Sequence, residues 1–358
     1  MGCSGSVSGT KVATSKGNPK TASDDTIYSF VDVQSLQLPF EFLLRDCSSY
    51  LCTSALVPSI CLTQQAFPII TASLPFDETG QSFIELPVVS AAFYGSGRVI
   101  CFPHGSIVYD IQDHGQTAVF FNHALSWIAH QNTTMTPILL LGFSPDLSSQ
   151  ATSILHSYGF FVEVCNKIQK INTYRIILVP SSFVCPSDEN YSKLVQFVEN
   201  GGGLAVFYLP SAEDEETMTL NFPINRLLSK FGLSYTFCSI TANEEPISIE
   251  KDFQVVYPHH FEKIAHKVIN ELKLPIDEIQ ETKLDNHVTT LRYNIIVCDE
   301  QEYDQMLEIY KACLEFLQAN EYVENQLFHP NNVQIIIILL LQDIIPRMPI
   351  DQILPAQG

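Results

Sequence analysis

The chain has 358 residues, with 39 acidic residues against 19 lysines and arginines, and its formal net charge is −20. Hydrophobic residues make up 46% of the chain, which is enough to bury a large core and excludes a disordered acidic protein. The acidity argues against nucleic-acid binding, because negative charge repels the phosphate backbone. Ten cysteines without a C-x-x-C motif indicate reduced thiols rather than a disulfide scaffold or a zinc ribbon.

The first residues match a lipidation signal. Met1-Gly2-Cys3-Ser4-Gly5-Ser6 fits M-G-x-x-x-[ST], which predicts myristoylation of Gly2 and places Cys3 for palmitoylation. Stable anchoring needs a second acyl chain, since one myristoyl group alone binds a membrane only marginally. Residues 1–23 hold three lysines and no acidic residue, so the remaining chain carries −23 and we expect a flexible, weakly basic tether. A chance match to so short a motif is the alternative.

The predicted elements begin with short strands and turns. Alternating or continuous apolar positions predict strands over residues 36–44, 67–74, 82–93 and 98–102. Gly95-Ser96-Gly97 precedes the last of these strands. Apolar residues at helical spacing from Phe120 to Ile128 then predict an amphipathic helix that ends near His130.

The next hundred residues alternate strand and helix. Apolar strands are predicted over 138–141, 160–164, 174–179 and 203–209. Ser144 as N-cap with Pro145 starts one helix that Gly159 ends, and Ser187 starts another that ends at Asn200-Gly201. Fully apolar strands separated by amphipathic helices are typical of a mostly parallel sheet covered on both faces. We therefore predict an α/β fold, a flavodoxin-like or Rossmann-like three-layer sandwich.

Beyond residue 240 the composition is more acidic, and the same alternation is predicted to continue. Helices are expected over 261–272 and 303–317, and strands over 291–297 and 333–341. The stretch 333–345 is too short, and too interrupted by polar residues, to span a bilayer. The predicted organisation is a lipidatable tail (1–25), a strand-rich part (26–132), a βα core (133–240) and an acidic C-terminal α/β part (241–358).

No catalytic or metal motif is complete. Gly95-Ser96-Gly97 lacks the third glycine of G-x-G-x-x-G and precedes a strand instead of following one. A nucleophile elbow needs glycines around its Cys or Ser, and neither Ser211 after strand 203–209 nor Cys185 after strand 174–179 has them. His259-His260-Phe261-Glu262 misses H-x-x-E-H, and no H-E-x-x-H occurs. We predict no catalytic residue, no metal site and no cofactor.

Several segments in order resemble one family. They are Ala66–Ile70, the Y-G-x-G-R-V segment Tyr94-Gly95-Ser96-Gly97-Arg98-Val99 with His104 after it, and the stretches 120–127, 194–204 and 222–233. Over about residues 50–235 the chain is similar to the TRP-channel-associated factors and their relatives with enhancin-type metallopeptidase domains. The resemblance implies a class I glutamine-amidotransferase-like domain that has lost its nucleophile. It carries over no peptidase activity, because the H-E-x-x-H module lies beyond the region matched.

The resemblance also implies a role. The channel-associated members of this family bind channels at the plasma membrane and influence their delivery and gating, so the resemblance implies an ion-channel partner. We also expect a membrane contact through the N-terminal lipid, and no binding of nucleic acid. The expected location is the cytosolic face of the plasma membrane, or the cytoplasm without the anchor. His104, Cys185 and Ser211 are the candidate residues of a vestigial cleft at the strand ends. The alternatives are a piece of an enhancin-type metallopeptidase-like protein, or a small-molecule hydrolase or amidotransferase-like enzyme that uses Cys185 or histidines.

Overall fold

A computed structural model gives the fold. It describes residues 33–52, 55–75, 83–109, 115–130, 137–168, 171–209, 222–236, 239–240, 246–275, 278–295, 303–319 and 332–348. These residues belong to one compact unit. The predicted tether over residues 1–25 lies outside the described residues.

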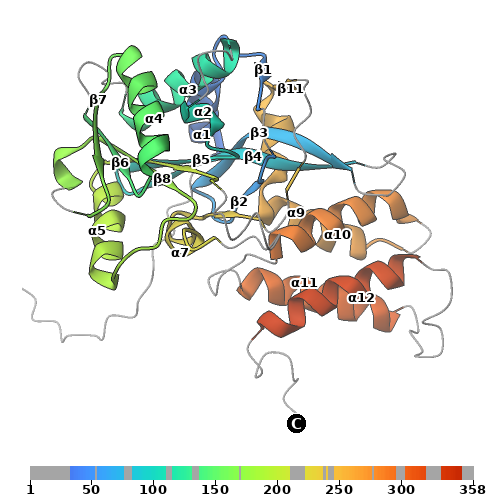
Figure 1. The fold of residues 1–358 in the computed structure, drawn as a ribbon. Coiled ribbons are helices and arrows are strands. Elements are labelled where there is room, and N and C mark those ends of the chain that lie inside the picture. The colour runs from blue at the N-terminus through green and yellow to red at the C-terminus, as the bar shows by residue number, and fades with distance from the viewer. Residues whose placement is uncertain are drawn as a thin grey trace, which may run out of the picture. The chain divides into compact units, whose positions relative to one another are not determined.

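A seven-stranded, mostly parallel sheet is the centre of the fold (Figure 1). Its strand order is β3-β4-β5-β9-β8-β6-β7; β4 pairs antiparallel with β3 and β5, and the other neighbours are parallel. The strands are β3 (Ala66–Pro75), β4 (Phe83–Tyr94), β5 (Gly97–Phe102), β6 (Pro137–Leu141), β7 (Phe161–Cys165), β8 (Ile176–Pro180) and β9 (Gly203–Phe207). The predicted mixed α/β class is confirmed.

The remaining elements are short ladders and helices. β1 (Ser49–Tyr50) pairs with β11 (Ile247–Ser248), and β2 (Ser59–Cys61) pairs with β10 (Leu233–Tyr235). The helices are α1 (Val33–Leu43), α2 (Ser106–Tyr109), α3 (Gly115–Ile128), α4 (Pro145–Ser157), α5 (Asp188–Glu199), α7 (Asn225–Leu228), α8 (Phe253–Val256), α9 (Phe261–Leu272), α10 (Glu281–Ile295), α11 (Tyr303–Ala319) and α12 (Asn332–Ile344). Single 3-10 turns lie at Ile171–Thr173, Ser229–Phe231, Tyr257–His259 and Ile345–Arg347.

Alternate side chains of the parallel strands enter two different cores. In β9, Ala205 and Phe207 pack in the core that holds the apolar faces of α1, α3 and α4. Leu204 and Val206 pack in the core that holds α5 and α7. Because successive side chains of a strand point to opposite faces, this division means that helices cover both faces of the sheet.

The β4–β5 hairpin explains the two glycines of the Y-G-x-G-R-V segment. Gly95 has φ +57° in the two-residue turn, a conformation that glycine adopts without strain. A Cβ on Gly97 would lie 1.9 Å from the carbonyl oxygen of Val198 in α5. The glycines therefore let the hairpin lie directly on the carboxyl end of α5, where Ser96 N–H donates to the Glu199 carbonyl at 2.9 Å.

Arg98 of the same segment joins the hairpin to α3. Its Nη1 donates to the backbone carbonyl of Trp127 at 2.5 Å, near the end of that helix. Its guanidinium carbon lies 5.2 Å from the Trp127 ring centroid and 5.8 Å from the Phe93 ring centroid. A cation at a helix carboxyl end that also stacks on aromatic rings is favourable for both reasons. The motif thus holds structural elements together.

The predicted helix starts of the βα region are confirmed. Ser144 Oγ accepts from Leu147 N–H at 3.4 Å, and Ser187 Oγ accepts from Asn190 N–H at 3.3 Å, so both serines are N-caps. Glycines with positive φ follow both helices, at Gly159 and Gly201.

The strand predicted over residues 36–44 is wrong, because α1 occupies this segment. Leu36, Phe40 and Leu43 are fully buried, whereas Leu38 is 71% exposed. That spacing of four and three residues buries one stripe of a helix. The apolar density of the segment and Pro39 concealed this period.

The strands predicted over residues 291–297 and 333–341 are also wrong. Residues 291–295 complete α10, residues 296 and 297 lie outside the described part, and α12 spans the second segment. α9, α10, α11 and α12 lie beside one another (Figure 1), and their side chains share one apolar core. Apolar residues fill both the buried positions of α12 and the partly exposed Leu339, so the segment lacks the sequence period that distinguishes a helix from a buried strand.

Within the described residues, no helix combines the length and the apolar character that a membrane span requires.

Candidate functional site

The carboxyl ends of the five parallel strands meet at one edge of the sheet. Ligand sites of open α/β sheets lie at this edge, so a binding or catalytic site would be expected here. Three adjacent parts of the edge are closed by side chains in the described structure.

The ends of β5 and β9 lie under Tyr235. Its buried hydroxyl lies 2.8 Å from the Phe102 carbonyl oxygen and 3.0 Å from the Val206 carbonyl oxygen, and donates to them. Phe222 lies beside it with ring centroids 5.5 Å apart, and Tyr208 packs on Phe222 at 5.8 Å. Burial raises the pKa of Tyr235 well above its ordinary value, so the hydroxyl remains a donor. Sequence reasoning missed this residue because it lies outside the strand it caps.

His104 lies in the same aromatic cluster, just beyond β5. It is 7% exposed, and its ring centroid lies 5.9 Å from that of Tyr208. Its Nδ1 accepts from the Ser106 N–H at 2.9 Å. Burial lowers the pKa of His104 to about 4, so the imidazole is neutral at pH 7. In this arrangement His104 caps the loop that enters α2.

This burial predicts a pH-dependent loss of stability. A histidine in the unfolded chain has a pKa of about 6.5, so between pH 6.5 and 4 the unfolded chain binds a proton that folded His104 does not. Its contribution is fully present above pH 6.5 and is lost as the pH falls. His104→Asn keeps an acceptor for Ser106 but removes the titration. We compare the free energy of unfolding at pH 7 and pH 5, measured by urea titration. The unaltered chain should lose roughly 2 kcal/mol more than the variant over this range. Equal losses in the two proteins would contradict the assignment.

The ends of β8 and β9 are joined by Ser181. Its Oγ accepts from the Leu209 N–H at 3.0 Å and lies 3.1 Å from the Leu209 carbonyl oxygen. At the neighbouring point, where strand order reverses between β6 and β8, Gly142 has φ +80° and the Phe183 ring lies against it. A Cβ on Gly142 would lie 2.6 Å from Phe183 Cδ2. Phe183 therefore occupies the position in which a doubly wound sheet usually binds its ligand.

Cys185 lies beyond β8 and is partly buried. Burial raises the pKa of its thiol, and the nearby Arg226 opposes this only in part. A nucleophilic cysteine needs a depressed pKa, and the shift at Cys185 has the opposite direction. His104 contacts Ser106 and Tyr208. Ser211, Gly2 and Cys3 lie outside the described residues.

The histidines of the 259–266 region have structural partners. His260 is buried and caps α9, with its Nδ1 accepting from Glu262 N–H at 3.2 Å. His259 Nε2 lies 3.1 Å from Glu85, whose pKa this contact lowers, and His266 Nε2 lies 3.9 Å from Glu262. Across the segments that the structure describes, no group of three or more His, Cys, Asp or Glu side chains is placed to hold a metal ion.

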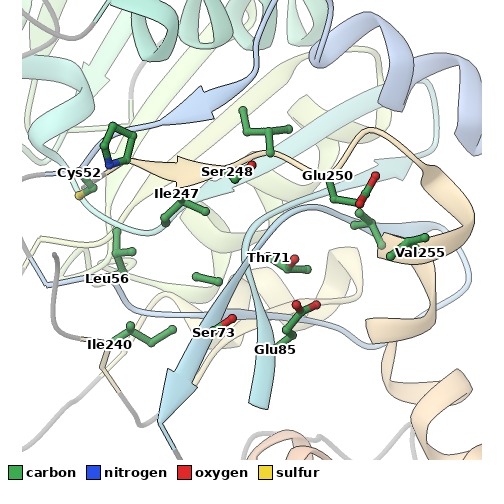
Figure 2. Close-up of a pocket in the computed structure, with 14 residues that line it drawn as sticks. Cys52, Leu56, Thr71, Ser73, Glu85, Ile240, Ile247, Ser248, Glu250 and Val255 are labelled. Carbon is green, nitrogen blue, oxygen red and sulfur yellow. The ribbon is translucent and has the colours of Figure 1, made fainter. Parts of the chain in front are cut away.

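A pocket of about 490 Å³ lies elsewhere, between β3 and β11 (Figure 2). Ile247 and Ser248 lie along one side of it, and Thr71, Ser73 and Glu85 lie along the other (Figure 2). Apolar side chains of Leu56, Ile240 and Val256 line it too, and Glu250 and Val255 lie at its helical end. Carboxylates beside apolar surface suit a cationic group on an aliphatic stem. No local pattern of residues marks this pocket, because its walls come from segments about 170 residues apart in the chain.

The comparisons with known proteins identify the family. The family model described as "TRPM8, N-terminal domain" (TCAF_N) matches residues 9–248, more than half of the chain. The chain belongs to this family. The resemblance inferred from the ordered motifs is thereby confirmed.

One curated relative and the solved structures agree with this membership. The chain is 28% identical over 204 residues to TRPM8 channel-associated factor 2 of Bos taurus, an alignment that covers 55% of this chain and 19% of the bovine protein. Two structures of IMPa from Pseudomonas aeruginosa, one with an O-glycopeptide and one of the metallopeptidase itself, match with TM-scores of 0.50 and 0.51 at 10% identity. Both matches cover 78% of this chain and 34% of IMPa, so they show a shared fold for part of a longer enzyme.

Proposed function

We propose that this TCAF_N-family protein is a non-enzymatic interaction protein that is anchored by N-terminal lipid to the cytosolic face of the plasma membrane. Its partner is an ion channel of the TRPM8 type, whose delivery or gating it influences. Family membership together with the name of the bovine relative, TRPM8 channel-associated factor 2, carries the proposal. The tail signal at Gly2 and Cys3 supports the anchor.

The strand ends support a role without catalysis. The order β7-β6-β8-β9 follows the 2-1-3-4 order of flavodoxin-like sheets, with β5 in the fifth position. We infer a class I glutamine-amidotransferase-like ancestry in which the nucleophile has been lost. Phe183 at the strand-order reversal and the protonated thiol of Cys185 both favour this inference.

The proposal predicts which proteins lie close to this chain in a cell, and proximity labelling measures them. A biotin ligase fused after residue 358 leaves Gly2 accessible for acylation. In the unaltered chain we expect biotin on plasma-membrane proteins, including co-expressed TRPM8. In Gly2→Ala we expect this labelling to fall about tenfold, because a palmitoylation site that is not first brought to the membrane gives little anchoring.

The matched control is Gly5→Ala, which changes the same residue type three positions later and keeps the lipidation pattern. Its labelling should equal that of the unaltered chain. If Gly2→Ala and the unaltered chain label the same cytosolic proteins, the anchor and the membrane partner are both wrong.

The likeness to IMPa fits a second origin without favouring it, namely a piece of an enhancin-type metallopeptidase-like protein. A transcript that continues in frame into an H-E-x-x-H segment would decide for that alternative.

A further inference from the structure

The pocket between β3 and β11 opens along the outer edge of β3. Ser73 pairs with Glu85 of β4, so their side chains and that of Thr71 lie on the same face of the sheet. The intervening Ala72, whose side chain points to the other face, also lines the pocket. Residues of both faces meet at the edge of a strand, so the pocket includes the edge of β3. We call it the β3–β11 groove.

Both walls of the groove offer a strand edge without a strand partner in the described part of the chain. β3 is the end strand of the seven-stranded sheet and pairs with β4 alone. β11 pairs with β1 alone, and its Ile247 and Ser248 both line the groove (Figure 2). A strand edge presents backbone N–H and C=O groups that can pair with another extended segment. A helix satisfies these groups within itself, so the groove favours an extended occupant.

The charge of the groove is negative. Among the described residues that line it, Glu85 and Glu250 are charged, and no lysine or arginine is present. The Glu85 side chain is half exposed, and its contact with His259 lowers its pKa, so the carboxylate is ionised at pH 7. Exposed Ser73 and Val255, which is 50% exposed, lie in the same lining. Such a surface complements lysine or arginine, whose aliphatic stem packs on apolar atoms while its charged head reaches a carboxylate.

We propose that the β3–β11 groove binds an extended, basic segment of a partner protein by strand addition, with lysine or arginine side chains beside Glu85 and Glu250. Backbone pairing supplies affinity, and the two carboxylates select charge. The inference deepens the proposed interaction role and rests on it for one point, that the occupant belongs to another protein. It requires neither the lipid anchor nor a particular channel.

A synthetic peptide tests the groove directly. The probe is a short fluorescein-labelled peptide of alternating lysine and threonine, and fluorescence anisotropy measures its binding to the full, unacylated chain. Glu85→Gln together with Glu250→Gln should weaken binding about tenfold, because glutamine keeps an acceptor oxygen and removes the charge. The matched control is Glu308→Gln together with Glu315→Gln, which removes the same charge from exposed positions of α11. It should change the affinity less than about twofold at physiological ionic strength, since distant exposed charges are screened.

Two further measurements separate strand addition from general attraction to an acidic chain. The same peptide with methyl groups on alternate backbone nitrogens keeps its charge but loses donors for strand pairing, so it should bind about tenfold more weakly or not at all. Benzoylphenylalanine in place of Ser248 should crosslink to the unmethylated peptide on irradiation. At Val164, which is exposed on β7 at the opposite end of the sheet, the same photoprobe should give no such crosslink.

Equal weakening by the two pairs of glutamine substitutions would overturn the proposal, as would equal binding of the methylated and unmethylated peptides. Absence of saturable binding, or crosslinks from position 248 that join two copies of the chain in place of the peptide, would overturn it too. The labelling of membrane proteins in cells tests the anchor and the channel partner separately. A chain that binds the peptide but labels only cytosolic proteins retains the groove and loses the anchor.

Discussion

Replacing Gly97 by alanine is expected to destabilise the fold by roughly 3 kcal/mol or more. The new Cβ would lie 1.9 Å from the Val198 carbonyl oxygen and 2.6 Å from the Gly202 carbonyl oxygen. Both are backbone atoms, so no side-chain rotation relieves the clash, and the hairpin has to separate from α5. Trp127, the one tryptophan of the chain, packs against Arg98 beside this hairpin, so its fluorescence during urea unfolding measures the effect directly.

Ser96→Ala is the matched control for this change. Ser96 is exposed in the same turn, and alanine there keeps its backbone N–H bond to Glu199. We expect a change within about 0.5 kcal/mol. If Gly97→Ala were as mild as Ser96→Ala, the close approach of the hairpin to α5 would be wrong.

The second large effect is expected in α12, where Leu340→Ala should lower the free energy of unfolding by about 2 to 5 kcal/mol. Leu340 is fully buried in the core that α9, α10, α11 and α12 share. Truncation of a buried leucine removes its transfer free energy and leaves a cavity. Urea unfolding followed by circular dichroism at 222 nm reports on these helices.

The neighbouring Leu339 distinguishes helix from strand. In α12, Val333, Ile337, Leu340 and Ile344 form the fully buried stripe, and Leu339 is 37% exposed. Leu339→Ala should therefore cost less than about 1 kcal/mol. In the predicted buried strand, Leu339 and Leu340 would both be enclosed on opposite faces, and the two substitutions would have similar effects.

Local signals in the sequence were reliable where each element carries its own start and stop. Ser144 and Ser187 cap helices as their sequence positions predict, since a serine side chain satisfies free N–H groups of the first turn wherever that turn lies. The apolar strands of the βα region were equally predictable, because a parallel strand buried on both faces must be apolar throughout. These signals depend on a few adjacent residues.

Periodicity failed where a segment has few polar positions. In α12, apolar residues also occupy exposed positions such as Leu339, so too few polar residues remain to mark a helical period. α1 failed for the related reason that its apolar positions are dense and Pro39 lies inside it. In both segments, the choice between helix and strand was made by the partners available for packing.

The candidate site residues also divide into those that the sequence indicated and those that only the structure revealed. The sequence indicated that His104 and Cys185 follow strands, but the side chains that close those strand ends, Tyr235 and Phe183, come from other segments. The pocket between β3 and β11 is lined by segments about 170 residues apart in the chain. Proximity of this kind arises from folding and leaves no local pattern.

By itself, the sequence determined the α/β class, the helix caps, the family and the segregation of charge into a basic start and an acidic remainder. These properties follow from residue type and short-range spacing, which act before any long-range contact forms. Only the tertiary structure decided that the C-terminal part is helical, that side chains cover the strand ends, and that two strand edges face each other across an acidic groove. Each of those outcomes depends on which distant segments exclude water from one another, and burial of that kind is a property of the assembled chain.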